Sequence, residues 1–125
     1  MSPVLFLVVA AGGFFGAPCR YLLDRAVTRR VNSDLPWGTF VINISGSFLL
    51  GLLTGLTLSH HLSDLGRAML GTGFCGAYTT FSTFTFETIR LVQDGRLLEA
   101  ASNVGVSVVV GLAAATAGLA LGLAT

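Results

Sequence analysis

The stretch GFCGAYTTFSTFTFE, residues 73 to 87, decides the fold. It lies inside an apolar run long enough to cross a bilayer, yet it is rich in glycine and in hydroxyl residues. Gly76 lowers helix propensity, and Thr79 and Thr80 can bond to nearby backbone groups. We therefore predict that this helix breaks near residues 75 to 80. Irregular backbone at membrane depth is tolerated only where protein buries it or where it lines a cavity or ion site.

The composition is that of a membrane protein. The chain has 125 residues, of which 53% are hydrophobic and only 10% are charged, and its mean hydropathy is +0.80. Soluble domains carry about 25% charged residues. The seven basic residues are all Arg, and the six acids nearly cancel them, so we expect no polybasic surface and no nucleic-acid partner. We place the chain in the inner (plasma) membrane, which it crosses several times.

Four segments are long enough to span a bilayer, since a helix needs about 20 mainly apolar residues to do so. They cover approximately residues 3–23, 37–59, 67–91 and 98–123. The connections between them are short and polar. The predicted fold is therefore an all-α membrane protein of one domain, residues 1–125, with four transmembrane helices, of which the third is broken near its middle. This leaves no room for a nucleotide-binding loop or a soluble catalytic site, so we do not expect an enzyme.

Glycines recur at a four-residue spacing on three of these segments. The pairs are Gly12 and Gly16, Gly51 and Gly55, and Gly118 and Gly122. Small residues at this spacing share a helix face and allow two helix backbones to approach closely. A bundle of four short helices is too small to surround a polar pathway with protein on all sides. We therefore expect the protein to function as a dimer.

Polar side chains occur within the predicted spans. Asn43 must find a partner because lipid offers none, and it either joins two helices or lines a pathway. Asn103 and Ser107 stand four residues apart on the last segment. They either pack against a neighbouring helix or line a polar pathway. Arg20 either reaches the interface or faces a water-filled vestibule that attracts anions. Glu87, the one acid near the interior of a span, lies toward one end of it, which disfavours proton-coupled transport.

Phe81 and Phe84 follow the predicted break three residues apart and share a helix face. The edge of an aromatic ring carries the positive part of its quadrupole. Two ring edges turned into a narrow pore can therefore meet an anion without the desolvation cost of a fixed cation. Ordinary core packing is the alternative interpretation for both side chains.

Three motifs resemble the Fluc, or CrcB-type, fluoride channel family. They are GFCGAYTTFSTF at 73–84, GTFVINISGSFLLG at 38–51 and GGFFGAPCRY at 12–21, in the family's order and along nearly the whole chain. The resemblance implies a passive, fluoride-selective channel that exports fluoride from the cytoplasm. It also implies an antiparallel dimer with two pores and a structural sodium ion at the dimer centre.

The same resemblance implies roles for single residues. Phe81 and Phe84 would be the pore phenylalanines, and Asn43 would lie beside the fluoride path. The backbone carbonyls of Gly76 and Thr79 would bind sodium together with those of a second subunit. The other implied pore positions are the vestibule residue Arg20 and the polar residues Thr83, Asn103 and Ser107. The chain departs from some or many relatives at Ala77, Tyr78, Asn103 and Gly111.

Two other classes of protein have a similar size. A small dual-topology multidrug transporter would use a membrane-embedded Glu in its first helix, and residues 3–23 contain no acid. A non-conducting assembly subunit would explain the glycine faces but leaves the broken helix and Asn43 without a purpose. We therefore place the fluoride channel first and keep the multidrug transporter as the alternative.

The Arg residues are distributed unevenly between the two sides of the membrane. The two connections on one side hold Arg25, Arg29, Arg30, Arg90 and Arg96, and the other side holds only Arg67. Basic residues in short loops are retained in the cytoplasm, so this bias favours both termini outside. A homodimer of opposed copies needs balanced charge, whereas a heterodimer with an oppositely oriented homologue does not. Both assemblies stay open, with the homodimer ahead because paired assembly could rescue the disfavoured insertion.

Overall fold

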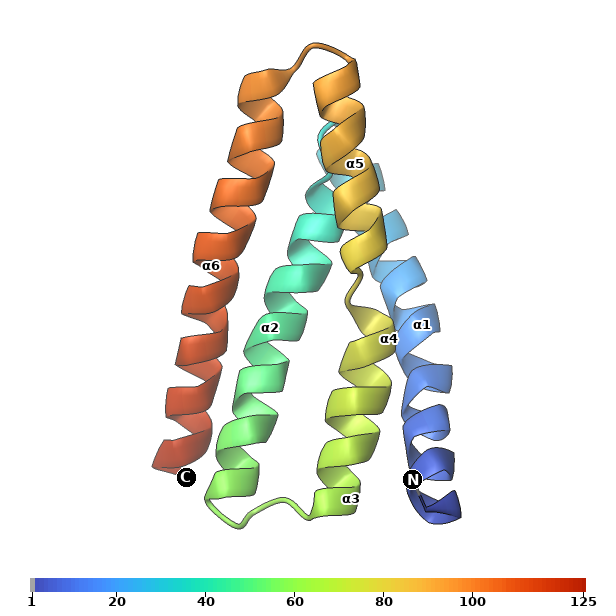
Figure 1. The fold of residues 1–125 in the computed structure, drawn as a ribbon, viewed down its shortest axis with the longest axis vertical. Coiled ribbons are helices and arrows are strands. Elements are labelled where there is room, and N and C mark those ends of the chain that lie inside the picture. The colour runs from blue at the N-terminus through green and yellow to red at the C-terminus, as the bar shows by residue number, and fades with distance from the viewer. Residues whose placement is uncertain (1) are drawn as a thin grey trace.

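The computed structural model describes residues 2–125, and every regular element in them is a helix. The elements are α1 (Pro3–Val31), α2 (Trp37–Leu58), α3 (Asp64–Arg67), η1 (Ala68–Cys75), α4 (Gly76–Tyr78), α5 (Phe81–Gln93) and α6 (Leu97–Ala124). They run up and down alongside one another (Figure 1). Both termini and the α2–α3 connection lie at one end, and the α1–α2 and α5–α6 connections lie at the other.

Three helices, α1, α2 and α6, are long and apolar enough to cross a membrane by length and composition. The bent segment from α3 to α5 runs alongside them and corresponds to the third predicted span (Figure 1). The predicted all-α membrane fold with a broken third helix is therefore confirmed. Helices α2 and α6 each begin and end within one residue of their expected bounds.

The first helix is longer than predicted. Helix α1 continues to Val31 instead of ending near Leu23. The expected end marked only the limit of the apolar run, and residues 24–31 contain no Gly or Pro that would stop a helix. The helix ends at Asn32, whose left-handed backbone (φ 49°) forms its cap. The end of the apolar run is therefore not the end of the helix.

Helices α2 and α6 approach closely through glycine, as predicted. A Cβ atom on Gly118 would overlap the carbonyl oxygen of Phe48, and one on Gly51 would overlap that of Ala115. The same backbone contact exists at Gly55 and Gly122. Any larger residue at these positions would push the two helices apart.

The remaining glycine pair lies where α1 packs against η1. A Cβ atom on Gly12 would overlap the carbonyl oxygen of Met69, and one on Gly16 would overlap that of Phe74. All three pairs therefore pack helices within one chain.

The third span changes its winding along its length. After the single turn of α3, η1 is a π-helix, with the wider i to i+5 hydrogen bonding. One further turn, α4, precedes two non-helical residues, Thr79 and Thr80, and α5 begins at Phe81. The predicted break near residues 75 to 80 is confirmed at the C-terminal edge of that window. The sequence does not predict the π-helical winding before it.

The single chain buries few large side chains. Ile42 and Leu53 on α2 and Leu91 on α5 are buried. Most large apolar side chains on α1 and α6 are exposed. Apolar surface this wide needs lipid or another protein chain to cover it.

Candidate functional site

The break in the third span is capped on both sides. Thr79 and Thr80 adopt extended backbone conformations, with ψ of 159° and 118°. The Oγ1 of Thr80 accepts a hydrogen bond from the N–H of Thr83 (3.2 Å) and so caps the first turn of α5. The hydroxyl of Thr79 donates to the carbonyl oxygen of Cys75 (2.8 Å). The chain therefore leaves one helix and starts the next with a defined geometry.

The side chain of Asn43 joins α2 to this break. Its Nδ2 donates to the carbonyl oxygen of Thr80 (3.0 Å), and its Oδ1 accepts from the N–H of Thr80 (2.9 Å). Asn43 thus pairs with both peptide groups that flank one residue, at a depth where lipid offers no partner. An amide nitrogen carries two N–H donors, so this pairing uses only one of them. The sequence left open whether Asn43 joins two helices or lines a pathway. The structure shows the hydrogen bonds that join two helical segments.

The same hydrogen bonds free two carbonyl oxygens. In a continuous helix, the N–H of each residue bonds to the carbonyl four residues earlier. The N–H of Thr80, which would serve Gly76, donates instead to Asn43. The N–H of Thr83, which would serve Thr79, donates instead to the Oγ1 of Thr80. Gly76 and Thr79 are the two residues whose carbonyls the family resemblance assigns to sodium.

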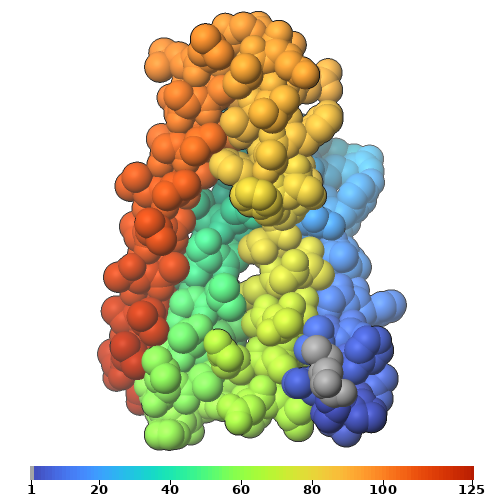
Figure 2. Space-filling view, in the orientation of Figure 1, coloured from blue at the N-terminus to red at the C-terminus, as the bar shows by residue number. Residues whose placement is uncertain are grey.

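A groove of about 430 Å³ lies between α2 and the broken span. Figure 2 shows the molecule hollowed in this region. Four of the predicted site residues line the groove: Asn43, Gly76, Thr79 and Phe81. A Cβ atom on Gly76 would meet nothing within 4 Å among the residues described. The break therefore borders open space in the single chain.

The two predicted pore phenylalanines differ in burial. Phe81 is 79% exposed, whereas Phe84 is half-buried. Their ring centroids are 6.2 Å apart, and the ring planes are tilted by 41°. Core packing within one chain is therefore excluded for Phe81, while Phe84 fits either interpretation.

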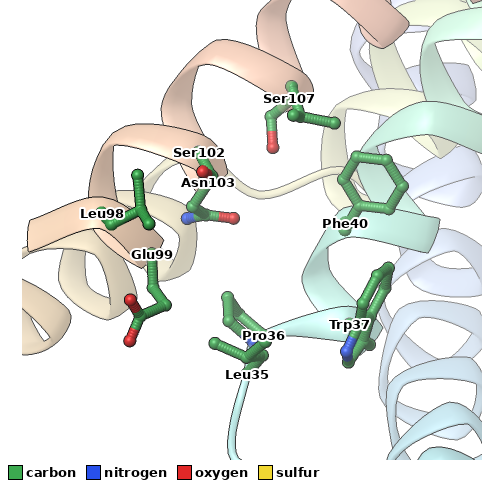
Figure 3. Close-up of a pocket in the computed structure, with 10 residues that line it drawn as sticks. Leu35, Pro36, Trp37, Phe40, Leu98, Glu99, Ser102, Asn103 and Ser107 are labelled. Carbon is green, nitrogen blue, oxygen red and sulfur yellow. The ribbon is translucent and has the colours of Figure 1, made fainter. Parts of the chain in front are cut away.

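A second cavity, of about 330 Å³, lies between the first turns of α2 and α6 (Figure 3). Asn103 and Ser107 line it from α6 and face Trp37 and Phe40 of α2. The Oγ of Ser107 is buried and has no hydrogen-bond partner within residues 2–125. The polar stripe on the last span thus faces a cavity rather than a packed helix.

Helix α5 fixes the orientation of Asn103. The Nδ2 of Asn103 donates to the Oγ1 of Thr88 (2.9 Å), whose hydroxyl donates to the carbonyl oxygen of Phe84 (2.8 Å). Figure 3 shows the oxygen of Asn103 on the side that faces α2. Ser107 adds a hydroxyl without a partner among the described residues to the same wall.

Three predicted site residues line neither space. Arg20 lies half-buried on α1, and Phe84 and Thr83 lie on α5. None of them borders the groove or the cavity in the part of the chain that the structure describes. The hydroxyl of Thr83 instead accepts a hydrogen bond from that of Thr80 (3.0 Å).

Sequence reasoning missed the central role of Thr80. This residue bonds Asn43 through its backbone and caps α5 through its side chain. A threonine directly before an apolar helical run is a typical N-cap signal, and that signal was sufficient to find it. The sequence marks Glu87 as the one acid near the interior of a span, but it does not predict that Glu87 is half-buried or that its Oε1 has no hydrogen-bond partner among the described residues.

Comparison with known proteins identifies the family. The family model described as "CrcB-like protein, Camphor Resistance (CrcB)" matches residues 7–119. The chain belongs to the CrcB family. The CrcB match includes most of α1 and α6 and all of α2 and the broken span. As a CrcB protein with several membrane-spanning helices, the chain is a multi-pass membrane protein, which in a bacterium means the plasma membrane.

Relatives of this CrcB chain carry informative names. A Streptomyces avermitilis protein named fluoride-specific ion channel FluC 1 is 49% identical over 114 residues, which cover 91% of this chain and 92% of the relative. A Nocardia farcinica protein of the same name is 51% identical over 114 residues, covering 91% and 78%. A Mycobacterium tuberculosis protein named fluoride-specific ion channel FluC 2 is 45% identical over 118 residues, covering 94% and 90%.

Proposed function

We propose that this CrcB chain is a subunit of a passive, fluoride-selective ion channel through which fluoride leaves the cytoplasm. The observation that carries the proposal is the capped break at Thr79 and Thr80, with Asn43 and the exposed ring of Phe81 on the same groove. The names of the similar proteins point to the same ion. Passive flow needs no bound nucleotide and no chemical step, so we assign no enzymatic activity.

Fluoride is small and strongly hydrated, so a pore must replace its water with hydrogen-bond donors and ring edges. The chain offers the ring of Phe81, the second N–H of Asn43 and the unpaired hydroxyl of Ser107. Fluoride enters a cell as neutral HF when the outside is acidic, and it ionises inside. A passive pore then lets the trapped anion leave down its electrochemical gradient.

The working unit in this proposal is an antiparallel dimer, with either a second copy of the chain or an oppositely oriented homologue. The groove beside Phe81 and Gly76 is open in one chain, and an open groove in lipid cannot carry a hydrated anion. A second chain that covers this face would close the pore. It would also cover the apolar surface that one chain exposes.

We further propose that a structural sodium ion lies between the two chains. The carbonyl oxygens of Gly76 and Thr79 have lost their helical donors, and oxygen ligands suit a hard cation. Two carbonyls from each chain would complete the ligand set. The ion would bind these carbonyl oxygens, which otherwise have no partner in a medium without water.

Sodium withdrawal tests this part of the proposal. Exhaustive exchange of sodium for a large organic cation should weaken dimerisation or lower fluoride flux, because the freed carbonyls lose their partner. Readdition of sodium should restore the lost property. Dimer stability by light scattering and fluoride efflux are the two measurements, and full retention of both in the organic cation would contradict the proposal.

The multidrug transporter is not favoured by any feature of the site. Helix α1 is longer than expected and includes one acid, Asp24, but it contains no Glu. The carboxylate of Asp24 packs against Gly38 in the first turn of α2. Such a transporter would need its carboxylate inside the apolar run of α1. Asp24 lies outside that run.

Efflux from liposomes separates these functions. Vesicles that hold the purified protein are loaded with fluoride or with chloride, and release of each anion is followed with an ion-selective electrode. A third set measures proton flux driven by a cationic drug. Fast fluoride release with little chloride release supports the channel. Drug-driven proton flux alone would identify a transporter. The absence of any flux would identify an assembly subunit.

A further inference from the structure

The polar stripe on α6 extends one turn beyond Asn103. Glu99, Asn103 and Ser107 follow one another at four-residue spacing, and all three line the cavity between α2 and α6 (Figure 3). Leu35 and Pro36 of the α1–α2 connection line the same outer end. The first charged group along this wall is therefore a carboxylate, which repels an approaching anion.

Arg96 pairs with this carboxylate and with a second one. Its Nε lies 2.6 Å from the Oε2 of Glu99, and its Nη1 lies 2.5 Å from the Oδ2 of Asp34. Asp34 belongs to the α1–α2 connection, so one guanidinium joins both connections at this end of the molecule. The hydrogen bonds to Glu99 and Asp34 raise the pKa of Arg96 above its ordinary value, which keeps the guanidinium charged. The side chain of Glu99 is 34% exposed and that of Asp34 is 76% exposed.

We propose that Arg96 sets the electrostatic potential at the mouth of this cavity and thereby the rate at which small anions reach Asn103 and Ser107. Arg96 offsets the charge of Glu99 at the point where the stripe begins. The consequence for fluoride rests on the proposed channel function, but the potential itself does not.

The sign of the effect separates this role from a purely structural one. Arg96→Gln removes both ion pairs and Glu99→Gln removes one of them, so a purely structural role predicts a loss in both variants, the larger one in Arg96→Gln. The electrostatic role predicts opposite results, because Arg96→Gln leaves two carboxylates at the mouth while Glu99→Gln removes one. A unit charge a few ångströms away in a water-like dielectric changes a local ion concentration by about threefold. We therefore expect Glu99→Gln to raise the anion rate and Arg96→Gln to lower it.

Two charge-matched variants serve as controls. Asp94→Asn removes a negative charge from the same α5–α6 connection, and Arg90→Gln removes a positive charge from the end of α5. Neither residue lines the cavity in the described structure. Both should change the anion rate much less than the corresponding variant of the ion-pair group.

The first measurement is fluoride flux at two ionic strengths. At about 10 mM salt, Glu99→Gln should increase the initial rate about threefold and Arg96→Gln should decrease it about threefold. At about 1 M salt, where the screening length falls to about 3 Å, both variants should approach the parent rate. A loss of flux in both variants that salt does not relieve would overturn the proposal in favour of a structural clamp.

The second measurement needs no ion conduction. Ser102, which also lines the cavity, is replaced by Cys in a chain that carries Cys19→Ser and Cys75→Ala. Its reaction with an anionic sulfonatoethyl and a cationic trimethylammoniumethyl methanethiosulfonate is then timed. Glu99→Gln should speed the anionic reagent and slow the cationic one, and Arg96→Gln should do the reverse.

The two measurements distinguish the failure of each idea. If the reagents respond as expected but the parent protein passes no fluoride, the channel function fails and the electrostatic role of Arg96 stands. If fluoride flows and the ratio of reagent rates is the same in all variants, the role of Arg96 is wrong. Failure of both reagents to react with the Ser102→Cys chain that keeps Arg96 and Glu99 would also overturn it, because the cavity would then be closed to water.

Discussion

A single amide determines the local geometry at the centre of this protein. Asn43 pairs with the N–H and the carbonyl of Thr80 at once, which no apolar side chain can do. The pairing holds the non-helical backbone in place, and it diverts the N–H that would otherwise serve the carbonyl of Gly76. A structural bond on one helix therefore creates the free oxygen on another.

Asn43→Ala should consequently lower stability as well as fluoride flux. Two hydrogen bonds of about 1 kcal/mol each are lost, so the free energy of unfolding should fall by about 2 kcal/mol. Denaturation in detergent, followed by circular dichroism, measures this. An Asn43→Ala protein as stable as the parent would show that the bonds to Thr80 contribute nothing.

Phe81→Ile should behave differently, because Phe81 is 79% exposed in the single chain. Its removal should change the stability of the chain little but lower fluoride flux by at least tenfold, since the isoleucine has no ring edge for an anion. Phe86→Ile is the matched control: Phe86 is 63% exposed on the same helix and does not line the groove in the described residues. Equal flux in both variants would remove Phe81 from the pore.

Helix packing depends on where a glycine lies rather than on glycine itself. Gly118 and Gly105 are both on α6, but a Cβ atom on Gly118 would overlap Phe48, while one on Gly105 has open space among the residues described. Gly118→Ala should therefore destabilise the protein by about 1–3 kcal/mol through overpacking. Gly105→Ala should be neutral or slightly stabilising because alanine favours helix. Thermal unfolding of the two variants side by side checks this, and equal shifts would contradict the close α2–α6 contact.

The sequence predicts some elements better than others, for physical reasons. Spans α2 and α6 and the break after Tyr78 follow from hydropathy and from clustered helix-poor residues, both of which are local properties. The extension of α1 to Val31 does not follow, because hydropathy reports the membrane and not the helix end. The π-helical winding of η1, which packs against the glycine face of α1, is not predicted either, because no local pattern in its residues marks it.

The candidate site divides in the same way. Asn43 could be selected because an amide inside a membrane span needs a partner, but the identity of that partner, Thr80, required the tertiary structure. The cavity wall that begins at Glu99 was only partly predicted: Asn103 and Ser107 were selected, but Glu99, at the start of the predicted span 98–123, was not. Arg20 was selected for its charge and for its match to the family's vestibule residue, and the described structure places it away from both spaces.

At the scale of the whole molecule, the uneven charge is the main constraint on assembly. The α1–α2 and α5–α6 connections lie at one end (Figure 1), and the Arg-rich ends of the spans lie there with them. Only Arg67 belongs to the opposite end. This distribution favours one orientation, with both termini outside the cytoplasm.

Labelling in intact cells tests the orientation. A cysteine added at the C-terminus, in a chain without Cys19 and Cys75, is exposed to a membrane-impermeant thiol reagent before and after permeabilisation. Partial labelling from each side is the result for a dual-topology homodimer, which we place first. Complete labelling from outside would instead require an oppositely oriented partner chain, and complete protection would contradict the charge rule for this protein.

The most direct test of the central claim, passive fluoride selectivity, is the zero-current potential across a planar bilayer that holds the purified protein. Fluoride is set tenfold higher on one side and chloride tenfold higher on the other, with sodium equal on both. A passive fluoride-selective channel should give about 59 mV, the potential for a tenfold gradient of a singly charged ion, with the sign set by the fluoride gradient. A potential near zero, or one with the sign of the chloride gradient, would contradict the account.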